Sequence, residues 1–432
     1  MNPVAAALFA ATFAAVIGRQ LLLRGPPVWV ILLGGAFGIV ASGALPVSGA
    51  TDAIALNLPL LIFLFSLFVL AAGLEQAGAL DHLARWVLSR TLNPRDLPFV
   101  LFVALGILSA FVVNDALVLV GVPLLFALAR RLKIAPTPIL LTLAFSVTVG
   151  STLTPFGNPQ NLLVSLGSGM TAPVSTFLRY LFLPTAANLL LGGLYVRRVF
   201  GPAISRDAPP QAPTPRTYLV PSGGLVPLFV RSPVVVVFPI TVAAMISLDV
   251  TSVLAEGPAV PLYVVALGGA VVVLLMTPGR SELFARVDWS ILVLFASLFV
   301  VIAGVVNGGV LSALESIVAI PGPSATGGLG VILASSFVGS QLVSNVPWVG
   351  LQIPIMQAAG YGAGTPLGWV ALAAGSTLAG NLTLLGAASN LIVVEQAEKA
   401  GVRIGLREFI RYGAPLALLT GAVLLACLTL GV

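Results

Sequence analysis

The sequence contains two similar stretches, SLFVLAAGLEQAGAL at residues 66–80 and SLFVVIAGVVNGGVL at residues 297–311. They agree at eight of fifteen positions. The same offset of 231 relates three further pairs: Ser109 with Ser340, Asn114 with Asn345 and Pro123 with Pro354. After a small gap in this alignment, TPFGNPQNLLV (154–164) aligns with TLLGAASNLIV (383–393). The matched positions include the few polar ones, which is typical of a duplicated transporter whose halves share a central site.

The composition indicates an integral membrane protein. The chain is 58% hydrophobic and 8% charged, whereas soluble domains average about 25% charged residues. Apolar segments long enough to span hydrocarbon recur along the chain, which predicts an all-α fold of about ten transmembrane helices. These are expected near 3–18, 27–46, 54–75, 137–170, 176–196, 233–249, 259–277, 289–307, 369–394 and 408–431.

Two further apolar stretches, 97–130 and 329–357, have arms that are too short to cross the bilayer separately. Each turns at an asparagine, Asn114 or Asn345. We therefore expect two re-entrant hairpins, one in each half.

The net charge of +6 reflects membrane orientation rather than binding to nucleic acid. If both hairpins return to their own side, 19 of the 20 basic residues fall on one face, and only Arg179 falls on the other. Such a bias identifies the cytoplasmic side of an inner membrane protein. The central linker and the basic loops that flank the hairpins are then cytoplasmic.

The same count predicts two inverted repeats, because the chain makes an odd number of crossings between the two similar stretches. The first repeat is expected at 1–200, with its hairpin at 97–130 and a broken helix at 137–170. The second is expected at 233–432, with its broken helix at 369–394. Between them, residues 201–232 are rich in Pro, Gly and Ser and predict a cytoplasmic linker.

Polar residues gather at four predicted breaks in the helices, at residues 113–115, 154–161, 344–347 and 381–390. Irregular backbone survives in hydrocarbon only if it is buried or lines a cavity. Freed amides and carbonyls, together with Asn, Ser and Thr side chains, could replace the hydration shell of a solute. No Arg or Lys lies in any break, which argues against ion pairing to a multiply charged anion. The candidate substrate-binding residues are Asn114, Asp115, Thr154, Gly157, Asn158, Asn161, Ser344, Asn345, Thr383, Gly386 and Asn390.

Asp115 is the one carboxylate at a break, and Val346 occupies its aligned position in the second half. A charge at membrane depth costs about 2.5–3.5 kcal/mol on insertion scales. The residue is therefore a candidate for ion or proton coupling, either as a proton carrier or as a Na⁺ ligand. The alternative is a structural one, in which Asp115 caps the second arm of the hairpin.

No catalytic or metal site is indicated. A nucleophile, a base and an orienting group do not occur together, and no phosphate-binding loop is present, so we expect a protein that is not an enzyme and needs no cofactor. The single cysteine, Cys427, lies in the last apolar segment. The single histidine, His82, stands beside Asp81 and Arg85 and is interpreted as an interfacial residue rather than a zinc ligand.

At its breaks the chain resembles the arsenite permease and sodium/proton antiporter branch (ArsB/NhaD type) of the ion transporter superfamily. The resemblance covers nearly the whole chain. The motifs that carry it are SAFVVNDALVLVGVPLL (109–125), SVTVGSTLTPFGNPQNLLV (146–164), LVSNVPWVGLQIPIM (342–356) and GSTLAGNLTLLGAASNLIVVEQA (375–397). The last of them is also similar to the plant silicon efflux transporters.

This resemblance implies efflux of arsenite, antimonite or a similar small hydroxide across the lipid bilayer by proton antiport, with an elevator-type movement and a homodimeric scaffold. It implies a substrate site at Asn114, Asp115, Asn158, Asn161, Asn345, Thr383 and Asn390. The alternatives within the superfamily are a Na⁺/H⁺ antiporter and a Na⁺-coupled transporter of carboxylates, sulfate or silicate. The carboxylate and sulfate branch has Ser-Asn-Thr motifs, where this chain has Val-Asn-Asp and Ser-Asn-Val. Whether a separate ATPase subunit attaches is left open.

Overall fold

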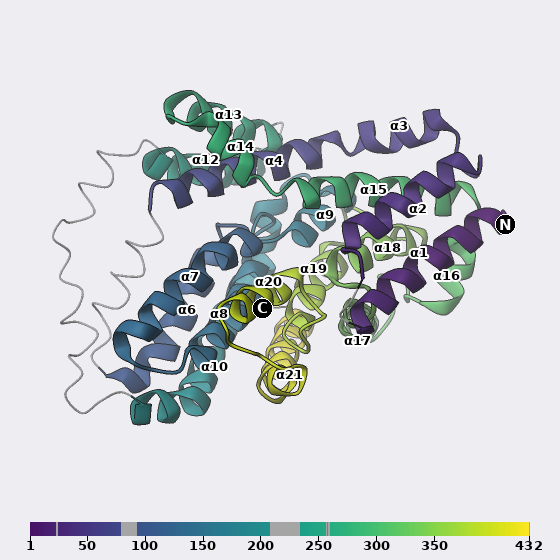
Figure 1. Cartoon of the computed structure of the whole chain (residues 1–432). Helices are drawn as coiled ribbons and strands as arrows, with labels where there is room; N and C mark the ends of the chain where they lie inside the picture. Colours follow the sequence, from purple (N-terminus) through teal and green to yellow (C-terminus); the bar gives the residue numbers. More distant parts are fainter. Residues whose placement is uncertain (23–24, 79–92, 208–233, 256, 258–259, 432) are drawn as a thin grey trace.

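The computed structural model describes residues 1–22, 25–78, 93–207, 234–255, 257 and 260–431 (Figure 1). Within these ranges the secondary structure is entirely helical. The predicted interfacial His82 and most of the predicted linker lie outside the described residues.

Six helices are long and apolar enough to cross a membrane, in the part of the chain that the structure describes. They are α4 (Leu58–Gln76), α8 (Pro136–Gly150) with its 3-10 extension η2 (Ser151–Leu153), α10 (Pro173–Asp207), α12 (Val234–Leu254), α15 (Trp289–Asn307) and α21 (Leu406–Leu430). The chain is therefore an all-helical membrane protein with several apolar spans.

The remaining helices are shorter or less apolar. Away from the four breaks they are α1 (Pro3–Leu22), α2 (Val28–Ala41), α3 (Val47–Leu56), α13 (Leu262–Met276), α14 (Arg280–Arg286) and α16 (Leu311–Ile317). Around the four breaks they are η1 (Pro94–Asp96), α6 (Leu97–Ser109), α7 (Asn114–Leu132), α9 (Pro159–Gly167), α17 (Gly328–Val343), α18 (Asn345–Ala358), α19 (Pro366–Ala379) and α20 (Ala388–Lys399).

Two predicted boundaries are wrong. The segment 54–75 is not one helix, because α3 ends at Leu56 and α4 begins at Leu58. Pro59 stands in the first turn of α4, where its missing N–H costs nothing but prevents a continuous helix. The linker does not begin at residue 201, since α10 continues to Asp207. At about 1.5 Å per residue this helix is some 50 Å long, so it extends beyond the hydrocarbon.

The breaks follow from local chemistry. The turn between α6 and α7 covers residues 110–113, and the turn between α17 and α18 is the single residue Ser344. After η2 the helix stops, and α9 starts with Pro159, which has no N–H to donate to the preceding turn. Each interruption leaves backbone groups without helical partners at the centre of the fold.

The helices of the N-terminal and C-terminal parts of the chain pack reciprocally. Helix α13 packs on α4, and α2 packs on α15; in the same way α18 packs on α9, and α20 packs on α7. Buried side chains from both parts join in one hydrophobic core cluster. Neither part therefore buries its apolar faces by itself.

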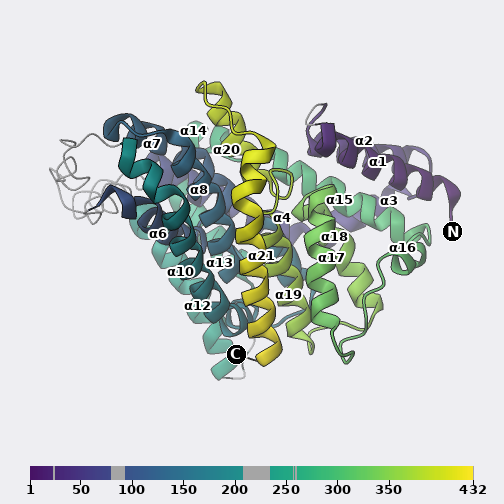
Figure 2. The ribbon, with the colours of Figure 1, turned by 90° about the horizontal axis from the view of Figure 1, so that it is seen from below.

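The figures show two groups of helices. In Figure 1, α3, α4 and α15 run along one side, with α12, α13 and α14 at one end and α1, α2 and α16 at the other. The helices that surround the breaks form the rest of the molecule. Figure 2 shows α21 lying between α10 on one side and α17 and α19 on the other.

The closest backbone approach in the first part lies between α6 and α8. A Cβ atom built on Gly150 would lie 1.8 Å from the carbonyl oxygen of Gly106. Because that atom belongs to a backbone rather than to a flexible side chain, only glycine fits at this position.

We expect Gly150→Ala to lower the free energy of unfolding by about 1–3 kcal/mol, since the added methyl group must push two helices apart. Thermal unfolding of the detergent-solubilised protein measures this loss. Gly268→Ala in α13 is the matched control, because nothing lies within 4 Å of its added Cβ. Equal melting temperatures for the two variants would contradict this account of the packing.

Candidate functional site

Two asparagines hold the first break in place. The Nδ2 atom of Asn161 donates hydrogen bonds to the carbonyl oxygens of Ser151 at 2.9 Å and Thr154 at 3.0 Å. Asn158 caps α9, because its Oδ1 accepts from the backbone N–H of Asn161 at 2.8 Å. Its Nδ2 lies 3.2 Å from the Ser151 carbonyl oxygen. The side chains thus replace helical partners that the break removes.

The second break is held by the same kind of contact. The Nδ2 atom of Asn390, which is aligned with Asn161, donates to the carbonyl oxygens of Gly380 at 2.6 Å and Thr383 at 3.4 Å. These two carbonyls occupy the positions aligned with those that Asn161 contacts. The Thr383 hydroxyl donates to Oε1 of Gln341 at 2.7 Å. The duplicated motif therefore has a duplicated hydrogen-bond pattern.

Thr377 of α19 joins the two breaks. Its Oγ1 atom lies 3.2 Å from Nδ2 of Asn158 and 3.2 Å from Nε2 of Gln160, and both amides donate to it. Its hydroxyl lies 3.1 Å from Oδ1 of Asn161. All four side chains are at least nine-tenths buried. One hydroxyl of the second part of the chain thus contacts three amides of the first.

The asparagines at the two helix-pair turns also contact the breaks. The backbone N–H of Asn114 donates to the carbonyl oxygen of Gly157 at 3.0 Å. The Asn345 amide is assigned so that its nitrogen donates to the carbonyl oxygen of Gly386 and its oxygen accepts from Gln160 Nε2 at 3.2 Å. Gly157 and Gly386 are aligned, so each turn meets the glycine of one break.

Ser344, immediately before Asn345, has a backbone conformation with a positive φ. Its φ of 69° is unusual for a residue with a side chain and costs about 1–3 kcal/mol. Its N–H donates to the carbonyl oxygen of Ser340 at 3.0 Å. The surrounding structure therefore fixes a strained turn beside the polar contacts.

These side chains form a neutral group, which we call the polar cluster. Its members are Asn114, Ser151, Thr154, Gly157, Asn158, Gln160, Asn161, Gln341, Asn345, Thr377, Asn381, Thr383, Gly386, Ser389 and Asn390. None of them carries an ionisable side chain. Three buried polar atoms of the cluster have no hydrogen-bond partner within the described structure: Oδ1 of Asn381, Oγ of Ser389 and Oδ1 of Asn390. Such atoms can accept hydrogen bonds from the hydroxyl groups of a small solute.

Asp115 lies outside the polar cluster, although the sequence placed it there. Asp115 lines a small cavity of about 30 Å³ together with Glu75, Arg286 and Asp288. It does not cap α7, for which no side-chain cap is present. Instead the side chain of Asn114 accepts from the backbone N–H of Asp115 at 2.8 Å. The two neighbouring residues therefore serve different sites.

The remaining predicted residues lie in or beside the polar cluster, and sequence reasoning missed six of its members: Ser151, Gln160, Gln341, Thr377, Asn381 and Ser389. Gln160 and Asn381 lie inside the predicted breaks, so their position was a usable signal. Thr377 and Gln341 lie in the preceding helices, where a lone polar residue in an apolar helix predicts no particular partner. Within the described residues, no group of three His, Cys, Asp or Glu side chains could hold a metal ion.

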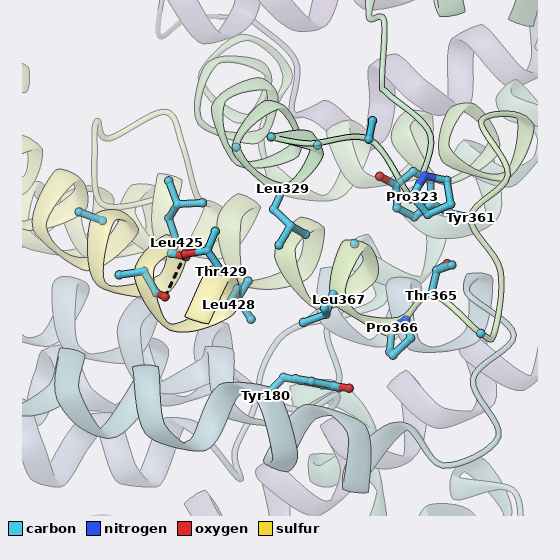
Figure 3. Close-up of a pocket in the computed structure, with 18 residues that line it drawn as sticks. Tyr180, Pro323, Leu329, Tyr361, Thr365, Pro366, Leu367, Leu425, Leu428 and Thr429 are labelled. Atoms are coloured by element: carbon cyan, nitrogen blue, oxygen red, sulfur yellow. Dashed lines mark hydrogen bonds between the residues drawn. The ribbon is translucent and has the colours of Figure 1, made fainter. Parts of the chain in front are cut away.

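A larger crevice, of about 1030 Å³, lies elsewhere (Figure 3). Leu329 of α17, Leu367 of α19 and Leu425 of α21 line it, with Tyr180 of α10 on the opposite wall. Its lining is mainly apolar, and its single dashed contact joins Thr429 to its own helix at Leu425. It contains no member of the polar cluster.

A helical membrane protein whose polar side chains meet where helices are interrupted has the construction of a secondary transporter. Residues 8–379 match the citrate transporter family, CitMHS, and the chain belongs to this family. It is a transporter and not an enzyme.

Two curated relatives and one solved structure illustrate the relationship. The chain is 30% identical to the silicon efflux transporter LSI3 of Oryza sativa over 425 residues, which cover 85% of each chain. It is 27% identical to an uncharacterized transporter of Mycobacterium tuberculosis over 375 residues, which cover 82% of this chain and 81% of the relative. The YdaH transporter of Alcanivorax borkumensis has a similar fold, with a TM-score of 0.57, 16% identity, and coverage of 99% of this chain and 98% of that one.

We expect Thr377→Val to lower the free energy of unfolding by about 1–3 kcal/mol, because it leaves buried amides of Asn158, Gln160 and Asn161 without their shared partner. Chemical denaturation in detergent measures the effect. Thr142→Val is the matched control, since the buried Thr142 hydroxyl donates only to the carbonyl of its own helix at Pro138. If Thr142→Val lowers the free energy of unfolding as much as Thr377→Val does, then this hydroxyl does not stabilise the three amides.

Proposed function

We propose that this protein exports small, uncharged hydroxides of the arsenite and antimonite class from the cytoplasm by proton antiport. The observation that carries the proposal is the chemistry of the polar cluster. It offers buried amides, hydroxyls and backbone carbonyls and no ionisable side chain, and three of its polar atoms lack partners. A neutral trihydroxide needs hydrogen-bond donors and acceptors but no counter-charge.

The silicon efflux relative supports the same substrate class. Its printed name describes the export of silicon, which in neutral water is a small uncharged hydroxide, and it covers 85% of this chain. The chemistry that would recognise such a solute matches the donors and acceptors of the polar cluster. Transport assays with arsenite, antimonite and silicate would show which of these hydroxides the protein exports.

The family description names citrate, which favours a second candidate function, the Na⁺-coupled transport of carboxylates. A tricarboxylate would normally be bound by Arg or Lys, whose charge-assisted hydrogen bonds to carboxylates are about twice as strong as neutral ones. The polar cluster has neither residue. Substrate-dependent Na⁺ uptake would support citrate, and sodium-induced proton release without any metalloid would support a Na⁺/H⁺ antiporter.

The alternating-access model that we propose rests on two inverted repeats, residues 1–200 and 233–432. The reciprocal packing of the two parts supports this division, as do the aligned contacts of Asn161 and Asn390. In this arrangement the α6–α7 and α17–α18 pairs are re-entrant hairpins that enter from opposite sides. They move with the broken helices as an elevator against a homodimeric scaffold in the inner membrane.

Everted membrane vesicles should accumulate arsenite when a proton gradient is applied. We expect Asn161→Ala and Asn390→Ala to reduce the initial rate by at least about tenfold, because each releases two backbone carbonyls that shape the site. The variant Thr142→Val should retain the rate of the unmodified protein. Undiminished uptake in both asparagine variants would overturn the assignment of the polar cluster.

The role of Asp115 is tested separately from binding. We expect Asp115→Asn to abolish proton-driven accumulation while leaving the exchange of internal for external arsenite intact, since the carboxyl lies outside the polar cluster. Measurements of net uptake and of exchange in the same vesicles separate the two effects. Unchanged pH-dependent transport in this variant would contradict the proposed coupling.

A further inference from the structure

The cavity beside Asp115 is formed where four elements meet. Helix α4 contributes Phe68, Ala72 and Glu75, and α7 contributes Asp115 and Leu119. Two more charged residues complete the lining: Arg286 at the end of α14 and Asp288 just before α15. The cavity therefore lies between the helix pair α6–α7 and the group of helices that contains α4, α14 and α15.

The charges around this cavity do not balance. Arg286 pairs with Glu75, and these side chains are 41% and 34% exposed. Asp288 caps α15, because its Oδ1 accepts from the backbone N–H of Ile291 at 3.3 Å. Asp115 is only 6% exposed and accepts no hydrogen bond from any residue that the structure describes. Three carboxyl groups thus share one guanidinium, which is already paired.

Among the residues that the structure describes, no other element lining the cavity supplies a cation to Asp115. Helix α8, which packs on α7, carries no ionisable side chain. Helix α20 packs on α7 through Gln396, whose Nε2 donates to the carbonyl oxygen of Leu119 at 3.4 Å. Its charged residues Glu395, Glu398 and Lys399 are exposed and do not line the cavity.

We propose that Glu75, Arg286 and Asp288 are positioning residues that make the contact between α7 and α4 depend on a proton at Asp115. An isolated buried carboxylate beside two other carboxylates is strongly disfavoured, whereas the neutral acid fits without a cation. Protonation therefore stabilises the arrangement seen here. Ionisation drives α7 away from α4.

The same geometry connects this proton to the polar cluster. Asp115 and Asn114 are consecutive, and the Asn114 N–H holds the carbonyl oxygen of Gly157 in the first break. A displacement of the start of α7 therefore reaches the break directly. This inference rests on the proposed proton antiport, but it assigns the coupling to a contact between helix groups rather than to the solute itself.

A cross-linking experiment tests the contact without any substrate. In the full-length protein with Cys427→Ser, we introduce Ala72→Cys and Ala116→Cys, which replace residues of α4 and α7 on the same small cavity. Disulfide formation is measured in proteoliposomes across a pH series. We expect the cross-linked fraction to fall by roughly tenfold as pH rises, because ionised Asp115 opens the contact. Adding Asp115→Asn should keep the fraction high at every pH.

Two further variants test the positioning residues. Glu75→Gln frees Arg286 to pair with ionised Asp115, and Asp288→Asn removes a like charge, so each should reduce the pH-dependent fall. A purely structural role would leave the pH profile unchanged. Phe68→Cys with Leu119→Cys is the substitute pair if the first one does not fold.

The control corrects for thiol reactivity, which itself increases with pH. Thr152→Cys with Thr185→Cys places thiols at hydroxyl positions 2.9 Å apart, away from the cavity, and should cross-link at every pH. A fall that persists in Asp115→Asn, or a fraction that never falls in the parent pair, would overturn the inference. Because no metalloid is present, failure of arsenite transport alone would leave this result unaffected.

Discussion

The fold depends on one constraint: every backbone group that a helix break frees must find a partner away from water. In both breaks that partner is an asparagine amide, Asn161 in the first and Asn390 in the second. An amide suits this task because its NH₂ group donates twice while its oxygen remains available. The oxygen of Asn161 meets the Thr377 hydroxyl, and the oxygen of Asn390 is unpartnered. The asparagine amides that stabilise the two breaks thus also lie where a solute could bind.

Polarity and charge are separated in this protein. Neutral polar groups gather at the breaks, while Asp115 faces the paired Glu75 and Arg286 across a cavity. In the proposed antiport, these separate locations would allow the solute and the proton to bind without competing for one group.

Much of the architecture could be predicted from the sequence, because hydrocarbon permits few solutions. Apolar length predicted about ten spans, whereas six helices of the described residues are long and apolar enough to cross a membrane. Pro and Gly beside Asn predicted where helices are interrupted, as at Pro159. The direction of a side chain at a turn could not be predicted. Asn114 and Asp115 are adjacent, yet Asn114 contacts the first break whereas Asp115 lines the small cavity, and only the tertiary packing of α7 determines this difference. Thr377 was missed for a related reason, since its partners lie more than two hundred residues away.

Reciprocal packing has a consequence for how the chain is made. Because α2 packs on α15, α7 on α20 and α9 on α18, the first part of the chain waits for partners that are synthesised later. During translation its helices can insert into the bilayer, but their interhelical faces stay in contact with lipid until α15 and α18 to α20 have left the ribosome. Assembly is therefore a late event in biosynthesis, and a chain that stops between α10 and α12 would remain a set of inserted helices without a completed core.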